Sequence, residues 1–280
     1  MSRRLLPGLA TVLGLARLGF FIPHRHAGSV LRAGRRPRYE ALAPLFRAAE
    51  GAMGEVFERI DSFAPALEAI GDEPPPAPRW TQDWFPRLDA AAAYALVRHH
   101  RPARIVEVGC GHSTRFLARA VKDAEAACEI VSIDPAPRAA IAALPIRHIE
   151  TAVQEADPTL FAVLEADDVL FIDSSHVLMP GTDVDVLFNR VLPRLPAGVL
   201  IHVHDIFLPR DYPLAWDWRA YNEQLGIAAL LQGGGYEILF ASAYAVEAMA
   251  VQLEAGIVAR LPLVDGAIES SLWLRKRASA

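Results

Sequence analysis

The stretch IVEVGCGHST, residues 105–114, decides the fold, because a short apolar run ends in two glycines and two hydroxyl side chains. Gly109 and Gly111 permit a tight turn and a close approach of the backbone to a ligand. Ser113 and Thr114 stand where the N-cap of a helix is expected, and they can also meet an anionic group. The stretch therefore predicts a buried strand, a tight turn and the start of a helix.

The chain on both sides continues this alternation of strands and helices. Apolar runs without polar interruption are typical of a parallel sheet that helices cover on both faces. Two strand-like segments near the C-terminus, 236–245 and 270–276, have no obvious helix between them and predict a closing hairpin with one antiparallel strand. We therefore expect a doubly wound α/β sheet. Its strands are predicted at 104–108, 129–133, 146–149, 169–172 and 199–203, with helices at 89–99, 114–121, 138–143 and 184–192.

The N-terminal part of the chain differs from this pattern. Apolar residues between Tyr39 and Ile70 recur at helical spacing, which predicts one or two amphipathic helices. The stretch GDEPPPAPRW, residues 71–80, then contains four prolines that cannot continue a helix and predict a semi-rigid linker. We expect a helical extension with its linker at 1–79 and the main domain at 80–280.

Composition and charge limit the classes of function. The 280 residues are 52% hydrophobic, enough for one large core, and the net charge of -5 argues against a surface made for nucleic acid. The two cysteines, Cys110 and Cys128, provide neither a disulfide framework nor a paired metal motif. This suits a reducing compartment, so we expect a cytoplasmic location.

Residues 1–38 carry eight arginines and no acidic residue. The apolar part, 5–22, is interrupted by Pro7 and Arg17, and a central arginine costs about 2.5–3.5 kcal/mol on insertion scales, which argues against a spanning helix. Two interpretations stay open. The segment either lies on an anionic membrane surface, which implies a membrane-associated protein, or packs as a helix on the domain or on a partner subunit of a homo-oligomer.

Two acidic residues accompany the glycine turn. Glu107 precedes the first glycine by two positions, and Asp134 ends the second predicted strand, where a carboxylate can accept hydrogen bonds from both hydroxyls of a ribose. The dinucleotide pattern G-x-G-x-x-G would need a glycine at position 114, where Thr114 stands. The combination therefore favours a ribose-containing cofactor and disfavours a dehydrogenase.

With these features the sequence resembles the class I S-adenosylmethionine-dependent methyltransferases. The stretch EVGCGHST corresponds to their first motif, with Ser113 where many members have a third glycine. The resemblance covers about residues 80–276. It implies a seven-stranded Rossmann-like sheet with an antiparallel last strand and S-adenosylmethionine as cofactor. The expected cofactor-binding residues are Glu107, Gly109, Gly111, Ser113, Thr114, Asp134 and Gln154.

Polar side chains also end the two strands that follow. Asp173 comes directly after the strand 169–172, and Asp205 comes after the strand 199–203. Neighbouring parallel strands bring such residues to one rim of the sheet, where two carboxylates can share a hard cation. His176 lies on the turn after Asp173, where a general base is expected.

This arrangement is similar to that of metal-dependent O-methyltransferases, most closely those that methylate sugar hydroxyls of macrolide antibiotics. Their Asp-x-x-His element contributes a magnesium ligand and a base, and an acidic-Asp pair completes the metal site. Asp173 and His176 match the first element, and His204 with Asp205 matches the second, with a histidine where the family often has an acid. The resemblance implies Asp173, His204 and Asp205 as ligands of magnesium or manganese, and His176 as the catalytic base.

The segment after Asp205 is rich in aromatic residues and proline. Tyr212 and Trp216 are predicted to contact the acceptor from a lid, although packing on the domain is an equal alternative. We expect methylation of a hydroxyl on a small molecule or glycoside. The alternatives are a metal-independent N-methyltransferase and a cofactor-fold protein that binds without catalysis.

Overall fold

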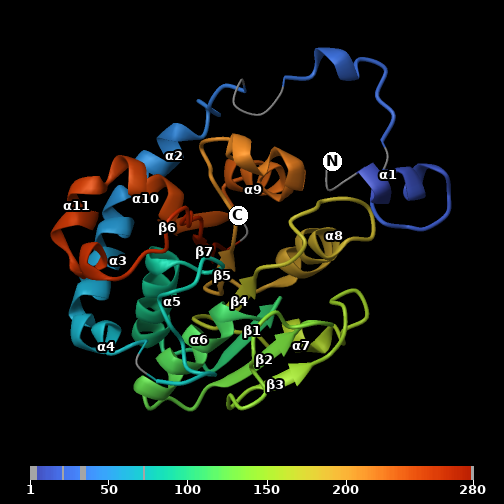
Figure 1. The fold of residues 1–280 in the computed structure, drawn as a ribbon. Coiled ribbons are helices and arrows are strands. Elements are labelled where there is room, and N and C mark those ends of the chain that lie inside the picture. Colours follow the sequence, from blue (N-terminus) through green and yellow to red (C-terminus); the bar gives the residue numbers. More distant parts are fainter. Residues whose placement is uncertain (1–4, 21, 32–35, 72, 279–280) are drawn as a thin grey trace.

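The computed structural model describes residues 5–20, 22–31, 36–71 and 73–278. Its centre is a seven-stranded sheet with the strand order β3-β2-β1-β4-β5-β7-β6. The first five strands run parallel, and β7 runs antiparallel to β5 and β6, which confirms the predicted Rossmann-like sheet (Figure 1). The strands are β1 (Arg104–Val108), β2 (Glu129–Ile133), β3 (Arg147–Ile149), β4 (Val169–Ile172), β5 (Leu200–Val203), β6 (Tyr236–Ala241) and β7 (Leu272–Lys276).

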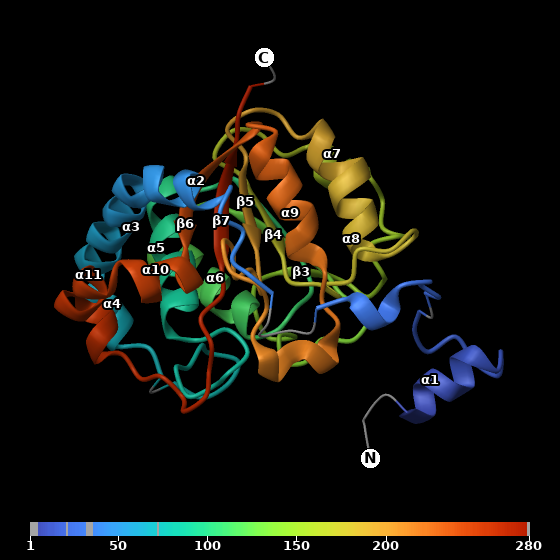
Figure 2. The same cartoon turned by 90° about the horizontal axis from the view of Figure 1, so that it is seen from above.

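Helices cover both faces of the sheet. Figure 2 shows α5 and α6 on one face and α7, α8 and α9 on the other. All residues of β4 and β5 are buried between these layers, which explains why β4 is wholly apolar and β5 is apolar except for His202. These helices are α5 (Arg87–His100), α6 (His112–Asp123), α7 (Thr159–Ala162), α8 (Asp183–Val186) and α9 (Glu223–Gln232).

The amphipathic stretch before the proline segment forms three helices that pack on the domain. Phe46, Met53 and Ile60 are fully buried and share one hydrophobic core with the sheet and α5. Core residues between Leu42 and Ile70 thus pack together with those of the main domain. The predicted boundary between the helical extension, 1–79, and the main domain, 80–280, stays a prediction. The helices are α2 (Ala43–Ala48), α3 (Glu50–Ser62) and α4 (Ala64–Glu68).

Two expectations about secondary structure were wrong. Residues 138–143 form bends and a turn in place of a helix, because Pro137 and Pro145 bound a segment too short for an independent helix. Arg115 ties this loop to α6 through two hydrogen bonds to the carbonyl of Ala140. At the C-terminus β6 and β7 do pair antiparallel, but helices separate them. Those helices are α10 (Ser242–Ala248), α11 (Ala250–Ala255) and the short η5 (Ile257–Arg260).

The remaining helical segments are short. α8 continues through the π-helical turn η2 (Leu187–Val191) and the 3-10 turn η3 (Leu192–Arg194), so the predicted helix at 184–192 is confirmed in its extent. The segment after β5 contains the 3-10 helix η4 (Leu214–Arg219). Near the N-terminus lie α1 (Leu5–Val12) and the turn η1 (Ala27–Ser29). Within the described ranges, no helix combines the length and the apolar character needed to cross a membrane.

Candidate functional site

The carboxyl ends of β1, β2 and β4 border a cleft of about 360 Å³. Gly109, Asp134, Gln154 and Asp173 are among the residues that line it. Gly109 has a φ of 87°, and a Cβ at this position would overlap the backbone carbonyl of Asp173. Only glycine therefore allows the turn after β1 to contact the end of β4. A Cβ at Gly111 would meet no atom within 4 Å.

Three residues predicted to bind the cofactor lie behind this turn. Glu107 is fully buried and accepts hydrogen bonds from Ser113 Oγ (2.7 Å), Thr114 Oγ1 (2.8 Å) and Ser132 Oγ (2.7 Å). Thr114 Oγ1 in turn accepts the N–H of Gly111 at 2.9 Å. Burial raises the pKa of Glu107 to about 7 despite these donors. The hydrogen bonds among Glu107, these hydroxyls and the N–H of Gly111 stabilise the conformation of the turn.

Asp134 and Gln154 occupy the walls of the cleft. The Asp134 carboxylate accepts the backbone N–H of Cys110 through Oδ2 and that of Ala136 through Oδ1, both at 2.7 Å. Each carboxylate oxygen can accept a second hydrogen bond, so these contacts leave acceptor capacity for ribose hydroxyls. Gln154 Nε2 donates to the carbonyl of Gly181 at 3.3 Å. The structure brings both predicted residues to the same cleft.

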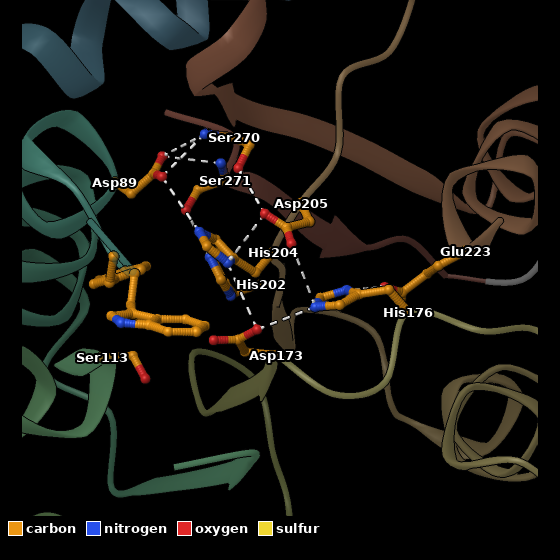
Figure 3. Close-up of polar contacts among 12 residues, drawn as sticks. Asp89, Ser113, Asp173, His176, His202, His204, Asp205, Glu223, Ser270 and Ser271 are labelled. Carbon is orange, nitrogen blue, oxygen red and sulfur yellow. Dashed lines mark hydrogen bonds and ion pairs between the residues drawn. The ribbon is translucent and has the colours of Figure 1, made fainter. Parts of the chain in front are cut away.

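A cluster of carboxylates and imidazoles lies beside this cleft, at the ends of β4 and β5. Nε2 of His176 is 3.3 Å from Asp173 Oδ1 and 3.5 Å from Asp205 Oδ2 (Figure 3). Nδ1 of His204 is 3.6 Å from an oxygen of each of the same carboxylates. The four residues come together as their positions at the strand ends predict.

Backbone conformation helps to aim two of these side chains. His176 and Asp205 have φ values of 59° and 58°, in the left-handed region, which costs a residue with a Cβ about 1–2 kcal/mol. The surrounding structure holds His176 in place, because its carbonyl accepts the N–H groups of Asn222 (3.1 Å) and Glu223 (3.3 Å). Such local strain is common at functional sites.

Sequence reasoning missed two carboxylates that complete the cluster. Glu223, at the start of α9, is fully buried, and its Oε2 lies 2.8 Å from Nδ1 of His176. Asp89, in the first turn of α5, is also fully buried; its Oδ2 lies 3.3 Å from Nε2 of His204. Each is the only acidic residue of its helix and lies in the first turn, a signal that could have identified them. Their histidine partners are far away in the sequence.

The carboxylates and imidazoles of the cluster shift one another's pKa values. Burial disfavours a charged His176, but Asp205, Asp173 and Glu223 outweigh it and raise the pKa of this imidazole well above 6.5. The pKa of His204 is raised in the same way, against burial, by the carboxylates around it. For Asp173, the two imidazoles outweigh burial and hold the pKa below its usual range. The carboxylates and imidazoles thus form one coupled network.

His202 differs from its neighbour His204. It stacks on Phe171 with ring centroids 3.7 Å apart, and its Nε2 lies 2.8 Å from Ser271 Oγ. Burial lowers its pKa well below 6.5. His202 is therefore a neutral histidine packed within β5.

A small polar pocket of about 120 Å³ opens above the cluster. Asp173, His176 and Asp205 form its floor, and Trp84, Arg138, Trp216, Arg219 and Tyr221 are among its walls. The Arg219 guanidinium lies 4.2 Å from the ring centroid of Trp216 and 3.8 Å from Asp205 Oδ2. Trp216 thus reaches the pocket. Tyr212 is buried and does not line it; its hydroxyl accepts the N–H of Gln224 at 3.2 Å.

The predicted metal ligands Asp173, His204 and Asp205 are close to one another. Within the described part of the chain, however, no group of three or more His, Cys, Asp or Glu side chains is arranged to hold a metal ion. The imidazoles lie against the carboxylates as ion-pair partners instead. Metal binding therefore stays a prediction.

Comparison with known proteins gives one family match. Residues 106–206 match the family model described as "Methyltransferase domain". No curated protein gives a significant match. Among solved structures, the fold is similar to the S-adenosylhomocysteine-bound methyltransferase PaMTH1 of Podospora anserina, with 16% identity, 93% of this chain and 100% of that chain covered, and a TM-score of 0.44. It is also similar to cmcI-D160 with Mg and SAM, with 18% identity, 75% and 89% covered, and a TM-score of 0.41.

The strand order, the glycine turn with Asp134 at the end of β2, and the family match over β1 to β5 agree with one another. They agree with the predicted Rossmann-like methyltransferase fold, and residues 106–206 match a methyltransferase domain.

Proposed function

We propose that the protein transfers the methyl group of S-adenosylmethionine to a hydroxyl of a small molecule or glycoside, with His176 as the base. One observation carries this proposal. The imidazole of His176 lies between Glu223, at Nδ1, and the carboxylates of Asp173 and Asp205, at Nε2. Asp173 borders both the cofactor cleft and the small polar pocket, so a hydroxyl in that pocket would lie next to the cofactor.

Glu223 fixes the role of each imidazole nitrogen. The surrounding carboxylates raise the pKa of His176, so the imidazole must first release the proton on Nε2; its Nδ1–H then still donates to Glu223, and the lone pair of Nε2 is available to the acceptor hydroxyl. A cation held by Asp173 and Asp205 would favour this neutral form, because its charge offsets that of the two carboxylates. The acceptor hydroxyl gives its proton to Nε2 while its oxygen attacks the methyl carbon of the sulfonium. A C–O bond forms, the C–S bond breaks, and neutral S-adenosylhomocysteine leaves. Asp173 and Asp205 stabilise the imidazolium that results.

A divalent cation is the second part of the proposal. Asp173, Asp205 and His204 would hold it, and their mixed oxygen and nitrogen donors suit manganese, iron or zinc better than magnesium, which prefers oxygen. The four carboxylates of the cluster face two imidazoles and the Arg219 guanidinium, so the carboxylates outnumber these basic groups by one. When bound, the cation would supply positive charge that stabilises the developing alkoxide.

The pocket walls favour an acceptor with a ring. Trp216 and Tyr221 present aromatic faces beside His176, whose ring centroid is 4.5 Å from that of Tyr221. Aromatic faces bind the apolar face of a sugar or an aromatic ring, and the polar floor then orients the hydroxyl. This supports a small molecule or glycoside as acceptor.

The test is formation of S-adenosylhomocysteine from S-adenosylmethionine with panels of hydroxylated small molecules, glycosides and amines, each with a chelator or with added Mn²⁺. We expect turnover of a hydroxylated acceptor, lost by about 10²–10⁴-fold in His176→Ala and kept in the control His26→Ala. We expect chelation to lower the rate. Turnover of amines alone would instead support metal-independent N-methylation. Cofactor binding without turnover of any acceptor would support a non-catalytic binding protein.

A further inference from the structure

The segment of residues 5–31 exposes a large share of apolar surface. Eleven of the twenty large hydrophobic side chains that are exposed in the described chain belong to it. α1 buries none of its residues, and Figures 1 and 2 show the segment at the edge of the molecule. Apolar patches of this kind mark interaction surfaces. These side chains are Leu5, Leu6, Leu9, Val12, Leu13, Leu15, Leu18, Phe20, Ile22, Val30 and Leu31.

The charge of the same region is one-sided. Residues 1–38 carry eight of the 28 basic residues and none of the 33 acidic residues, so they contribute +8 and the remaining chain -13. Arg17 and Arg25 lie among the exposed apolar side chains. An apolar surface flanked only by positive charge is complementary to an anionic bilayer, which accepts the apolar groups below its headgroups and pairs with the cations.

We propose that residues 5–31 bind the surface of an anionic phospholipid membrane and lie in its interface. Arg17 stands in the middle of the apolar stretch, where an interfacial position lets its side chain reach the headgroups. A protein partner would need an acidic surface with matching apolar pockets. A second copy of this chain offers its own acidic body, and the experiment below separates that case from the membrane.

The position of the segment links this surface to the candidate site. Residues of α1 border a groove with Val177, Met179, Arg219 and Asn222, and Leu18, Gly19, Phe20 and Ile22 also line it. Val177 follows His176 directly, and Asn222 precedes Glu223. Docking of residues 5–31 would therefore place the wall of the candidate site near the bilayer. Membrane binding itself does not depend on methyl transfer.

The test is flotation of the full-length protein with vesicles of phosphatidylcholine alone and of phosphatidylcholine with phosphatidylglycerol. We expect binding only to the anionic vesicles, weakened by salt. The double variant Leu13→Glu/Leu15→Glu should lose binding, and Arg17→Ala and Arg25→Ala should each weaken it roughly fivefold. Val251→Glu is the matched control, because Val251 is 82% exposed on α11, outside the segment; this variant should bind as the wild type does.

Three results would overturn the proposal. The first is failure of the wild type to float with anionic vesicles. The second is equal flotation of the wild type and the double variant. The third is a change in oligomeric state in analytical ultracentrifugation, caused by the double variant and not by Val251→Glu, with vesicle binding unchanged. This last result would assign the surface to a second copy of the chain.

Discussion

The carboxylate of Glu223 lies 2.8 Å from Nδ1 of His176, on the opposite side of the imidazole from Asp173 and Asp205. Glu223 is completely buried, and burial raises its pKa. A buried acid that fixes the tautomer of a histidine is the arrangement by which many enzymes orient a general base. Glu223 therefore acts in our proposal as a positioning residue, and His176 as the group that takes the proton.

Replacement of Glu223 by glutamine tests this relationship. The amide can donate to Nδ1 and so favour the tautomer that carries its proton on Nε2, which cannot act as a base. We expect the methylation rate to fall by about 10²–10⁴-fold with an acceptor that the wild type uses. The affinity for S-adenosylhomocysteine should stay unchanged, because Glu223 does not line the cofactor cleft. The control is the exposed Glu254→Gln. A rate for Glu223→Gln equal to that of this control would remove Glu223 from the mechanism.

The two glycines of the turn should respond differently to alanine. Gly109→Ala places a methyl group against the backbone of Asp173 and strains a φ of 87°, so we expect a loss of about 1–3 kcal/mol or more in the free energy of unfolding. Gly111→Ala meets no protein atom and should leave the melting temperature unchanged. We expect it instead to weaken S-adenosylhomocysteine binding roughly tenfold, because the cofactor approaches this turn closely. Thermal unfolding and calorimetry measure both effects. Equal destabilisation by the two substitutions would contradict the structure.

Asp89 should be important for stability. It accepts the N–H groups of Ser270 and Ser271 and faces His204, so it connects α5 to the start of β7. Removal of one partner from a buried pair costs about 3–5 kcal/mol, which is the loss we expect for Asp89→Ala in denaturant unfolding. The matched control is Glu55→Ala, which breaks the exposed ion pair with Arg59 on α3 and should cost about 0–1 kcal/mol. Similar losses in the two variants would show that burial does not distinguish these pairs.

Glu107 should make stability depend on pH. Its pKa is raised from 4.5 to about 7 in the folded protein, chiefly by burial, so the folded state holds the proton more tightly than the unfolded state. The stability that it contributes is complete below pH 4.5 and is lost as the pH rises through about 7. Relative to Glu107→Gln, the wild type should lose up to about 1.4 kcal/mol per pH unit in this window. Denaturant unfolding at a series of pH values measures the difference, and parallel curves would show that Glu107 is already ionised.

Much of the fold could be predicted because the central strands have the apolar sequences that are typical of buried strands. β1, β2 and β4 are short, mainly apolar segments followed by Gly109, Asp134 and Asp173, and the structure has these strands where the sequence predicts them. The helices between β6 and β7 were missed. Ala245, Met249 and Leu253 are buried at intervals of four residues, a helical pattern that the alanine-rich context obscured.

The site could be predicted only where its residues end a strand. Asp173, His176, His204 and Asp205 follow β4 and β5, and strand neighbours share a rim of the sheet. Glu223 and Asp89 come from helices, and only the tertiary packing brings them to the imidazoles. Ser113 and Thr114 stay predicted cofactor-binding residues. The structure adds that their hydroxyls donate to the buried Glu107 carboxylate, a contact that the sequence does not reveal.

The most direct test of the cofactor site is calorimetric titration with S-adenosylhomocysteine of the wild type, of Asp134→Ala and of the control Asp157→Ala, which removes an exposed carboxylate at α7. Melting temperatures establish that all three proteins are folded. We predict that the wild type and Asp157→Ala bind equally, and that Asp134→Ala binds at least about tenfold more weakly, because charged hydrogen bonds to the ribose are lost. Equal affinity of all three proteins, or no binding by the wild type, would contradict the site described here.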